Sequence, residues 1–226
     1  MIGVFDSGVG GLTALCELRK IAPNVNICFL ADRKNAPYGT KKKEEIVKFT
    51  RSNIKRLRNM GVDKILMACC TASTVYQELS IEEKRLCVPI IEPAARRALT
   101  ISKNKRIGVI ATERTVKEEA FKRAILKSEP SAYVFELQAQ KFVSLVESGA
   151  RDFILTSDEI KEIESILLPI KSRDIDTLIL GCTHFPHIKH KIEEILGIPT
   201  VNPSLEGALE IAKHTELSED GRTIYL

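Results

Sequence analysis

The chain has 226 residues, enough for two modest lobes or one larger α/β unit with a substantial core. Its 44% hydrophobic and 28% charged residues are typical of a soluble globular protein, and a net charge of +4 without a basic, aromatic-rich stripe argues against nucleic-acid binding. No apolar run approaches the roughly 18 residues that cross a bilayer, the N-terminus carries no export signal and the six cysteines form no disulfide framework, so we expect a cytoplasmic protein without a membrane partner.

The first half of the chain alternates short apolar segments with amphipathic ones. The apolar segments predict strands at residues 2–5, 25–31, 65–69 and 88–91. The amphipathic segments predict helices at residues 12–21 and 42–59, with two more beginning near Thr71 and at Glu92-Pro93. Strands that alternate with helices are typical of parallel sheets.

At Arg106 the pattern restarts, because Ile107-Gly108-Val109 echoes Ile2-Gly3-Val4. A helix at residues 114–127, a strand at 133–137, helices around Leu145 and Ile163, and a strand ending at Cys182 follow. We therefore predict an α/β fold of two similar lobes with mainly parallel sheets, related by a pseudo-twofold axis, with the active site in the cleft between them. The first lobe would span residues 1–92 and the second 93–203. A final helix near residues 205–214 would pack back on the first lobe within segment 204–226, and residues 215–226 are predicted to be weakly ordered.

Two strands, one in each half, are predicted to end at a cysteine followed by a threonine and a helix start: Cys69 and Cys182. Ligands of open α/β sheets bind at the carboxyl ends of the strands, so the two thiols would flank one ligand as a two-sided acid/base pair. A helix N-terminus lowers a thiol's pKa and favours the thiolate. Cys16, Cys28 and Cys87 are interpreted as small buried hydrophobes.

The glycine-rich turn Asp6-Ser7-Gly8-Val9-Gly10-Gly11 also follows a strand, so its backbone N–H groups could face an anion. It is not a dinucleotide fingerprint, since Thr13 stands where the third glycine is required. A zinc site is the alternative use of Cys182, His184, His187 and His190. The spacing lacks a CxxC pair and is looser than that of structural zinc sites, so His187 and His190 are better interpreted as exposed helix residues.

Seven segments, in order along the chain, resemble glutamate racemases of the cofactor-independent aspartate/glutamate racemase superfamily. They are Asp6-Ser7-Gly8-Val9-Gly10-Gly11-Leu12, Pro37-Tyr38-Gly39, Ala68-Cys69-x-Thr71-Ala72, Ile91-Glu92-Pro93, Ile107-Gly108-Val109-Ile110-x-Thr112, Phe142-Val143-x-Leu145-Val146-Glu147 and Leu180-Gly181-Cys182-Thr183-His184-Phe185-Pro186. The resemblance runs to about residue 203.

The resemblance implies inversion of glutamate at Cα by two cysteines, with no cofactor and no metal. It implies that Cys69 acts on one face with Asp6 beside it, and Cys182 on the other with His184 and Glu147. The substrate-binding residues that it implies are Ser7, Pro37, Tyr38, Gly39, Cys70, Thr71, Thr112, Thr115 and Thr183, with Tyr38, Gly39 and Thr115 as the clamp on the side-chain carboxylate. The product, D-glutamate, would supply peptidoglycan synthesis.

Three positions depart from the family pattern. Cys70 stands where asparagine is usual, Ala139-Gln140-Lys141 where a Cys-Pro pair is usual, and Asn202-Pro203-Ser204 where Asp-Ser is usual. A thiol cannot reproduce both halves of an amide's hydrogen bonding. Two alternative functions therefore stay open: racemisation of aspartate or another amino acid, and a binding or regulatory protein on a racemase scaffold. A homodimer is also left open.

Overall fold

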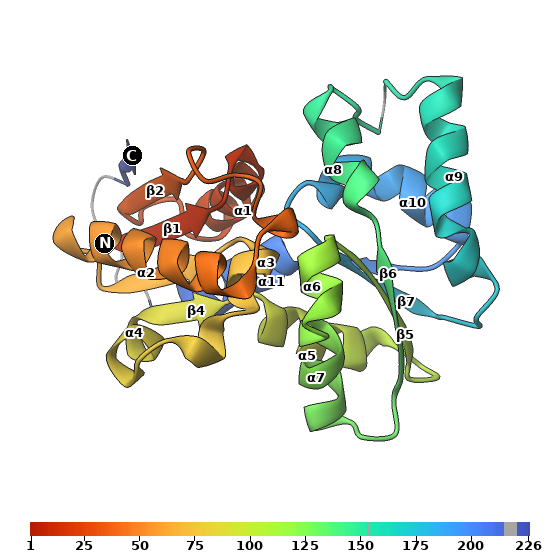
Figure 1. Cartoon of the computed structure of the whole chain (residues 1–226), viewed down its shortest axis with the longest axis horizontal. Coiled ribbons are helices and arrows are strands. Elements are labelled where there is room, and N and C mark those ends of the chain that lie inside the picture. The colour runs from red at the N-terminus through yellow and green to blue at the C-terminus, as the bar shows by residue number, and fades with distance from the viewer. Residues whose placement is uncertain (153, 215–220) are drawn as a thin grey trace.

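The structure is a computed structural model that describes residues 1–152, 154–214 and 221–226. Two α/β lobes lie side by side, each built on one parallel sheet (Figure 1). The first sheet has the order β4-β3-β1-β2-β9, made of Cys87–Pro89, Lys64–Met67, Ile2–Asp6, Ile27–Ala31 and Thr223–Tyr225. The second has the order β6-β5-β7-β8, made of Tyr133–Gln138, Arg106–Ala111, Thr177–Gly181 and Thr200–Val201.

The two sheets repeat one topology, which confirms the prediction of an α/β fold with two lobes and parallel sheets. The order β4-β3-β1-β2 in the first lobe corresponds strand by strand to β8-β7-β5-β6 in the second. In this correspondence β3 matches β7 and β1 matches β5. Cys69 and Cys182, which follow β3 and β7, therefore leave equivalent strand ends in the two lobes.

Helices cover both faces of the first sheet. Helix α2, Lys43–Asn59, packs on the face that carries Phe5 and Leu30, while α1, Leu12–Ile21, and α11, Pro203–Ala212, pack on the face that carries Val4. Alternation of side chains along β1 places Val4 and Phe5 on opposite faces. Two short helices, α3 at Cys70–Ser73 and α4 at Ile81–Leu86, complete this lobe.

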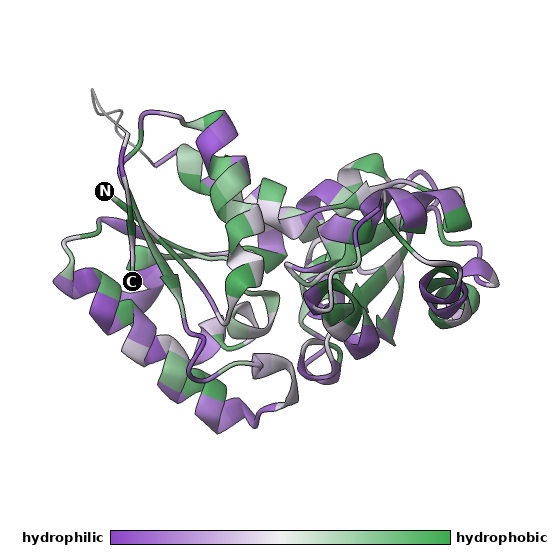
Figure 2. Cartoon of the chain, turned by 90° about the horizontal axis from the view of Figure 1, so that it is seen from above, coloured by the Kyte–Doolittle hydropathy of each residue, from purple (hydrophilic) through white to green (hydrophobic). Residues whose placement is uncertain are grey.

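The second sheet is covered in the same manner. One face packs on α5, Ile91–Ile101, and α7, Ala120–Ser128, and the other on α8, Gln140–Glu147, α9, Ser157–Lys171, and α10, Lys189–Leu196. Hydropathy follows this layering, since apolar residues colour the strands and polar residues colour the outer helix faces (Figure 2). None of the helices in the described residues is long and apolar enough to cross a membrane.

One apolar core is shared by the two lobes. It joins β1 and α1 of the first lobe to β5 and α7 of the second through α5 and α11, which pack against each other. The chain passes between the lobes twice, through α5 after β4 and back at Asn202-Pro203 after β8. Helix α11 packs against α1 and β3 of the first lobe, and the domain limits at residues 92/93 and 203/204 stay a prediction.

Several local predictions differ from the structure. The helix expected at residues 114–127 is divided into α6, Glu113–Lys117, and α7, because Glu119 adopts a left-handed backbone with φ of 47°. The helix expected after Thr71 ends at Ser73. Strands β8 and β9 and helix α4 were not expected: β9 lies in a segment predicted to be weakly ordered, of which residues 215–220 are outside the described residues. Cys16 is exposed, whereas Cys28 and Cys87 are buried as expected.

Candidate active site

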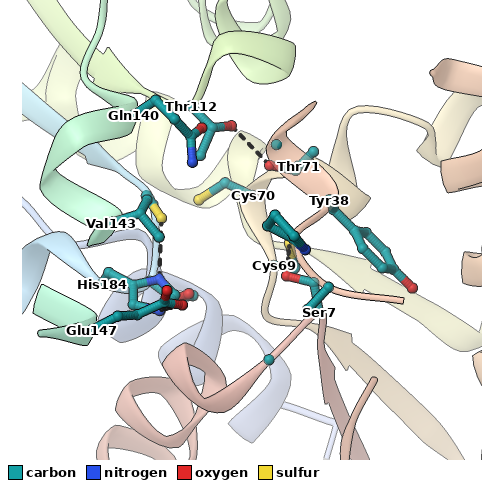
Figure 3. A pocket seen from close by; sticks show the side chains of 16 residues that line it. Ser7, Tyr38, Cys69, Cys70, Thr71, Thr112, Gln140, Val143, Glu147 and His184 are labelled. Atoms are coloured by element: carbon teal, nitrogen blue, oxygen red, sulfur yellow. Dashed lines mark hydrogen bonds and ion pairs between the residues drawn. The ribbon is translucent and has the colours of Figure 1, made fainter. Parts of the chain in front are cut away.

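A cavity of about 40 Å³ lies where the carboxyl ends of the two sheets meet (Figure 3). Both lobes line it, with Ser7, Gly8, Ala36, Pro37, Tyr38, Gly39, Cys69, Cys70 and Thr71 from the first and Thr112, Gln140, Val143, Glu147, Cys182, Thr183 and His184 from the second. This volume holds only a few water molecules, so the lobes must part to admit an amino acid. All the residues implied for the site line the cavity, except Asp6 and Thr115.

Cys69 forms one side of the cavity. It is the N-cap of α3, where its Sγ accepts a hydrogen bond from the backbone N–H of Ala72 at 3.4 Å. The Ser7 hydroxyl, from the turn after β1, lies 3.3 Å from the same sulfur. The thiol is therefore held by two strand ends of the first sheet.

Asp6 lies behind the side of the cavity that Cys69 forms. It is fully buried at the end of β1, accepts a hydrogen bond from Gly8 N at 2.8 Å and a second from Thr183 Oγ1 at 3.3 Å. Burial raises the pKa of its carboxyl above the ordinary value, although these hydrogen bonds and nearby His184 act in the opposite direction. Asp6 thus connects the two lobes beneath the cavity, and its charge raises the pKa of Cys69.

Cys182 forms the opposite side and continues into a chain of polar groups. Its Sγ lies 3.5 Å from Nδ1 of His184, and Nε2 of that histidine lies 3.3 Å from Oε1 of Glu147, an ion-pair contact whose angles do not make a hydrogen bond. Cys182 and His184 are buried, whereas the Glu147 side chain is 57% exposed. A nucleophile or base oriented by a second and third group is typical of acid/base sites.

Burial decides the protonation of both thiols. It raises the pKa of Cys69 to about 11 and raises that of Cys182 as well, because a thiolate loses its hydration inside the closed cavity. The backbone N–H of Ala72, at the start of α3, lowers the pKa of Cys69 as expected, but burial outweighs it, so the expected net decrease is wrong. Helix α3 has only four residues, and the 3-10 turn near Cys182 begins three positions later, at Phe185. These raised pKa values favour the neutral form of both thiols near pH 7.

Threonine hydroxyls join the lobes above the thiols. Thr71 Oγ1 lies 2.9 Å from Thr112 Oγ1 and 3.2 Å from Thr115 Oγ1, and the last two hydroxyls lie 2.9 Å apart. Thr115 is completely buried behind this pair and does not reach the cavity. Its contribution is to orient Thr71 and Thr112, which do.

Tyr38 lines the cavity, but its hydroxyl is bonded elsewhere. The hydroxyl donates to Oδ2 of Asp32 at 2.6 Å and accepts a hydrogen bond from Nδ2 of Asn53 at 3.1 Å, and Figure 3 shows it directed away from Gln140 and His184. The Tyr38 hydroxyl therefore cannot serve as the carboxylate clamp in this conformation. Asn53 was not expected in the site. Its only sequence signal is an amide on the buried face of α2, between Ile46 and Leu57.

The glycines of the cavity allow close approach between the lobes. A Cβ at Gly10 would collide with Thr183 Oγ1 and lie 2.8 Å from the His184 ring, and one at Gly39 would lie 2.7 Å from Gln140 Oε1. The Gly8 N–H of the glycine-rich turn donates to the carboxylate of Asp6, and the expectation that the turn also faces an anion of a ligand stays a prediction. The turn serves to bring the second lobe against the first.

Four lining residues were not expected: Gly8, Ala36, Gln140 and Val143. Gln140 follows the end of β6 and could have been found by the strand-end rule that found the cysteines. His187 is half-buried and His190 exposed, and neither lines the cavity. Across the described residues, no group of three or more His, Cys, Asp or Glu side chains is arranged to hold a metal ion.

Comparisons with known proteins agree on one family. The family model of Asp/Glu/hydantoin racemases matches residues 11–210. The glutamate racemase of Aquifex pyrophilus is 41% identical over 223 residues, which cover 97% of this chain and 84% of that protein. That of Listeria monocytogenes is 39% identical over 216 residues, covering 93% and 79%.

Solved structures agree with this match. Glutamate racemase from Francisella tularensis in complex with D-glutamate superposes with a TM-score of 0.88 at 32% identity, covering 99% of this chain and 85% of that chain. Aspartate racemase from Picrophilus torridus, at 20% identity and a TM-score of 0.67, shares the fold.

Proposed function

The chain belongs to the family of Asp/Glu/hydantoin racemases, and from this membership we propose that it interconverts L- and D-glutamate with two thiols and no cofactor. The observation that carries the proposal is the pair Cys69 and Cys182, which leave equivalent strand ends and line opposite sides of one cavity. Racemisation needs a base on one face of Cα and an acid on the other, and the reverse reaction exchanges their roles.

In the proposed reaction one cysteine, as thiolate, removes the Cα proton while the other, as thiol, delivers a proton to the opposite face. For Cys69 the groups that assist are Asp6 and Ser7, and for Cys182 they are His184 and Glu147. Because burial favours the neutral form of both thiols, one must first pass its proton to a neighbouring base, which is Nδ1 of His184 for Cys182 and the carboxylate of Asp6 for Cys69. The positive α-ammonium of the substrate would favour that thiolate, as an opposite charge does in a site closed to water.

The carbanion that forms at Cα needs electrostatic stabilisation, since no cofactor delocalises it. Ser7 and Thr71 line the cavity, and their hydroxyls, together with backbone N–H groups of the strand ends, are the proposed donors, while the Thr183 hydroxyl donates to Asp6. The hydroxyl network of Thr71 and Thr112 holds these donors before the substrate binds, so little reorganisation accompanies the reaction. The main chain of Tyr38 and Gly39 is the proposed contact for the side-chain carboxylate, and the proposed cellular role is supply of D-glutamate for peptidoglycan in the cytoplasm.

Solvent exchange tests the proposal directly. Purified protein is incubated with L-glutamate in deuterated water without added cofactor, and Cα deuteration is followed by proton NMR and D-glutamate by chiral chromatography. Deuterium at Cα together with D-glutamate is expected. Cys69→Ser and Cys182→Ser should each abolish racemisation, because each face has one candidate base, while Cys16→Ser, at an exposed free cysteine, should match the wild type.

Three outcomes contradict parts of the proposal. Near wild-type turnover in either cavity variant would disprove the two-thiol mechanism. Racemisation of L-aspartate in preference to L-glutamate would change the substrate and keep the mechanism. Absence of exchange with every amino acid tried would favour a binding protein on a racemase scaffold.

A further inference from the structure

Gln140 is a cavity residue whose amide has no hydrogen-bond partner. It is the first residue of α8, two positions beyond the end of β6, and it lines the cavity between the lobes. Its Oε1 is buried, and no partner for it exists within residues 1–152, 154–214 and 221–226. Buried polar atoms in folded proteins are nearly always paired, so an orphaned one inside a ligand cavity points to the ligand as its partner.

The surroundings of the amide cannot satisfy it. On one side lies the Cα of Gly39, so close that a Cβ there would stand 2.7 Å from Oε1. On another side lies Thr112, whose hydroxyl is already engaged by Thr71 and Thr115. Val143, one helical turn along α8, is apolar. A bound molecule is therefore the remaining source of a partner.

The position of Gln140 in the cavity selects the part of the substrate that it would meet. Cα must lie between the two thiols, and Figure 3 shows Gln140 with Thr112 and Thr71 at the end of the cavity opposite to Ser7, His184 and Glu147. A substrate side chain that extends away from the thiols reaches this end. The backbone of Gly39 borders it as well.

We propose that Gln140 binds the far end of the substrate side chain and determines specificity for a carboxylate there. Oε1 can only accept a hydrogen bond and a carboxylate has no proton to donate, so binding requires the Gln140 amide to turn by about 180° and place Nε2 where Oε1 now lies. The two N–H groups of the neutral amide then bind the carboxylate without placing a like charge beside it. The assignment rests on the proposed racemase activity and adds a specificity residue to it. Gln140 would bind substrate and take no part in proton transfer.

Replacing the neutral amide of Gln140 by a negative carboxylate is the most discriminating test of its role in specificity. Gln140→Glu keeps the shape of the side chain and places a carboxylate against the side-chain carboxylate of glutamate. We expect kcat/KM for L-glutamate to fall by about 100-fold or more, and that for L-glutamine by less than about tenfold, since a desolvated like-charge contact is strongly unfavourable. Gln138→Glu is the matched control, because Gln138 is exposed, outside the cavity, and makes the same change of charge two residues away.

A second variant separates binding from folding. Gln140→Leu removes the amide at similar volume and should raise KM for glutamate by about tenfold or more with kcat changed less than about threefold, the pattern of lost uniform binding. Two results would overturn the assignment of Gln140 and leave the proposed function intact. They are equal losses of kcat/KM for glutamate and glutamine in Gln140→Glu, and an unchanged KM for glutamate in Gln140→Leu. A wild-type chain that does not racemise glutamate would overturn the proposed function and the assignment with it.

Discussion

The buried amide of Asn53 is expected to control the cavity wall from outside the cavity. Its Nδ2 donates to Oδ2 of Asp32 at 3.2 Å and to the Tyr38 hydroxyl at 3.1 Å, and the side chain is 2% exposed. Replacing Asn53 by leucine keeps a side chain of similar size and removes both donors. The hydrogen bond from the Tyr38 hydroxyl to Asp32 would remain, but the acceptor oxygens of Asp32 and Tyr38 would each lose the donor that Asn53 supplies.

The size of the effect follows from these contacts. A hydrogen bond to a charged acceptor contributes about 1.5–3 kcal/mol and one between neutral groups about 0.5–1.5 kcal/mol. Leucine recovers about 1 kcal/mol through its greater apolar burial. Asn53→Leu should therefore lower the free energy of unfolding by about 1–3.5 kcal/mol, which in a chain of 226 residues lowers Tm by roughly 2–14 °C.

Thr50→Val is the matched control, because Thr50 lies one turn earlier on α2, is also buried, and its Oγ1 has no partner among the described residues. Removing an unpaired hydroxyl should leave stability unchanged or raise it by about 1 kcal/mol. Urea unfolding and thermal unfolding of the two variants measure the contrast. In kinetics, Asn53→Leu should raise KM for glutamate through the Tyr38 and Gly39 main chain. Equal stability of the two variants would refute the network.

Three further predictions concern the cavity itself. Burial raises the pKa of Cys69 to about 11, so the fraction of thiolate increases close to tenfold per pH unit between pH 7 and 9. We expect kcat/KM, corrected for titration of the substrate ammonium, to increase by the same factor. A flat profile would mean that a thiol is already ionised. Gly10→Ala places a methyl group against Thr183 and the His184 ring and should lower kcat by at least about tenfold with the lobes still folded, which circular dichroism checks; full activity would contradict the close approach. Cys70→Asn restores the amide usual in the family. A lower KM for glutamate would identify Cys70 as the cause of weak binding, and a higher KM would show a site adapted to the thiol.

The parts of the site that the sequence predicts are those that lie at strand ends. Cys69 and Cys182 end buried apolar runs, and in a parallel sheet such runs place the following residue at the ligand edge. Asn53 belongs to the middle of a helix and reaches the site only through Asp32 and Tyr38. The contact of Asn53 with Asp32 and Tyr38 joins three segments of the chain, and the periodicity of apolar residues within one segment cannot predict it.

The net direction of the thiol pKa shifts could not be predicted from the sequence, for a related reason. A strand end followed by a helix predicts a low thiol pKa, but the sign depends on how tightly the second lobe closes over the thiol. Closure is a property of the pair of lobes. The same limit applies to Glu119, whose left-handed backbone divides a continuous helical pattern, and to β9, whose short segment becomes a strand only because β2 offers it a free edge.

The two passages of the chain between the lobes have a mechanical consequence. Bodies joined by a single linker can swivel in any direction, but two linkers leave one easy rotation, about the line that connects them. Here those linkers are α5 and Asn202-Pro203, beside the shared apolar core, while the cavity lies at the strand ends. A small rotation about this axis displaces the residues of the cavity, which lie far from the axis, more than it displaces the residues near the axis. We expect such a rotation to separate the two thiols while the packing near the axis changes little.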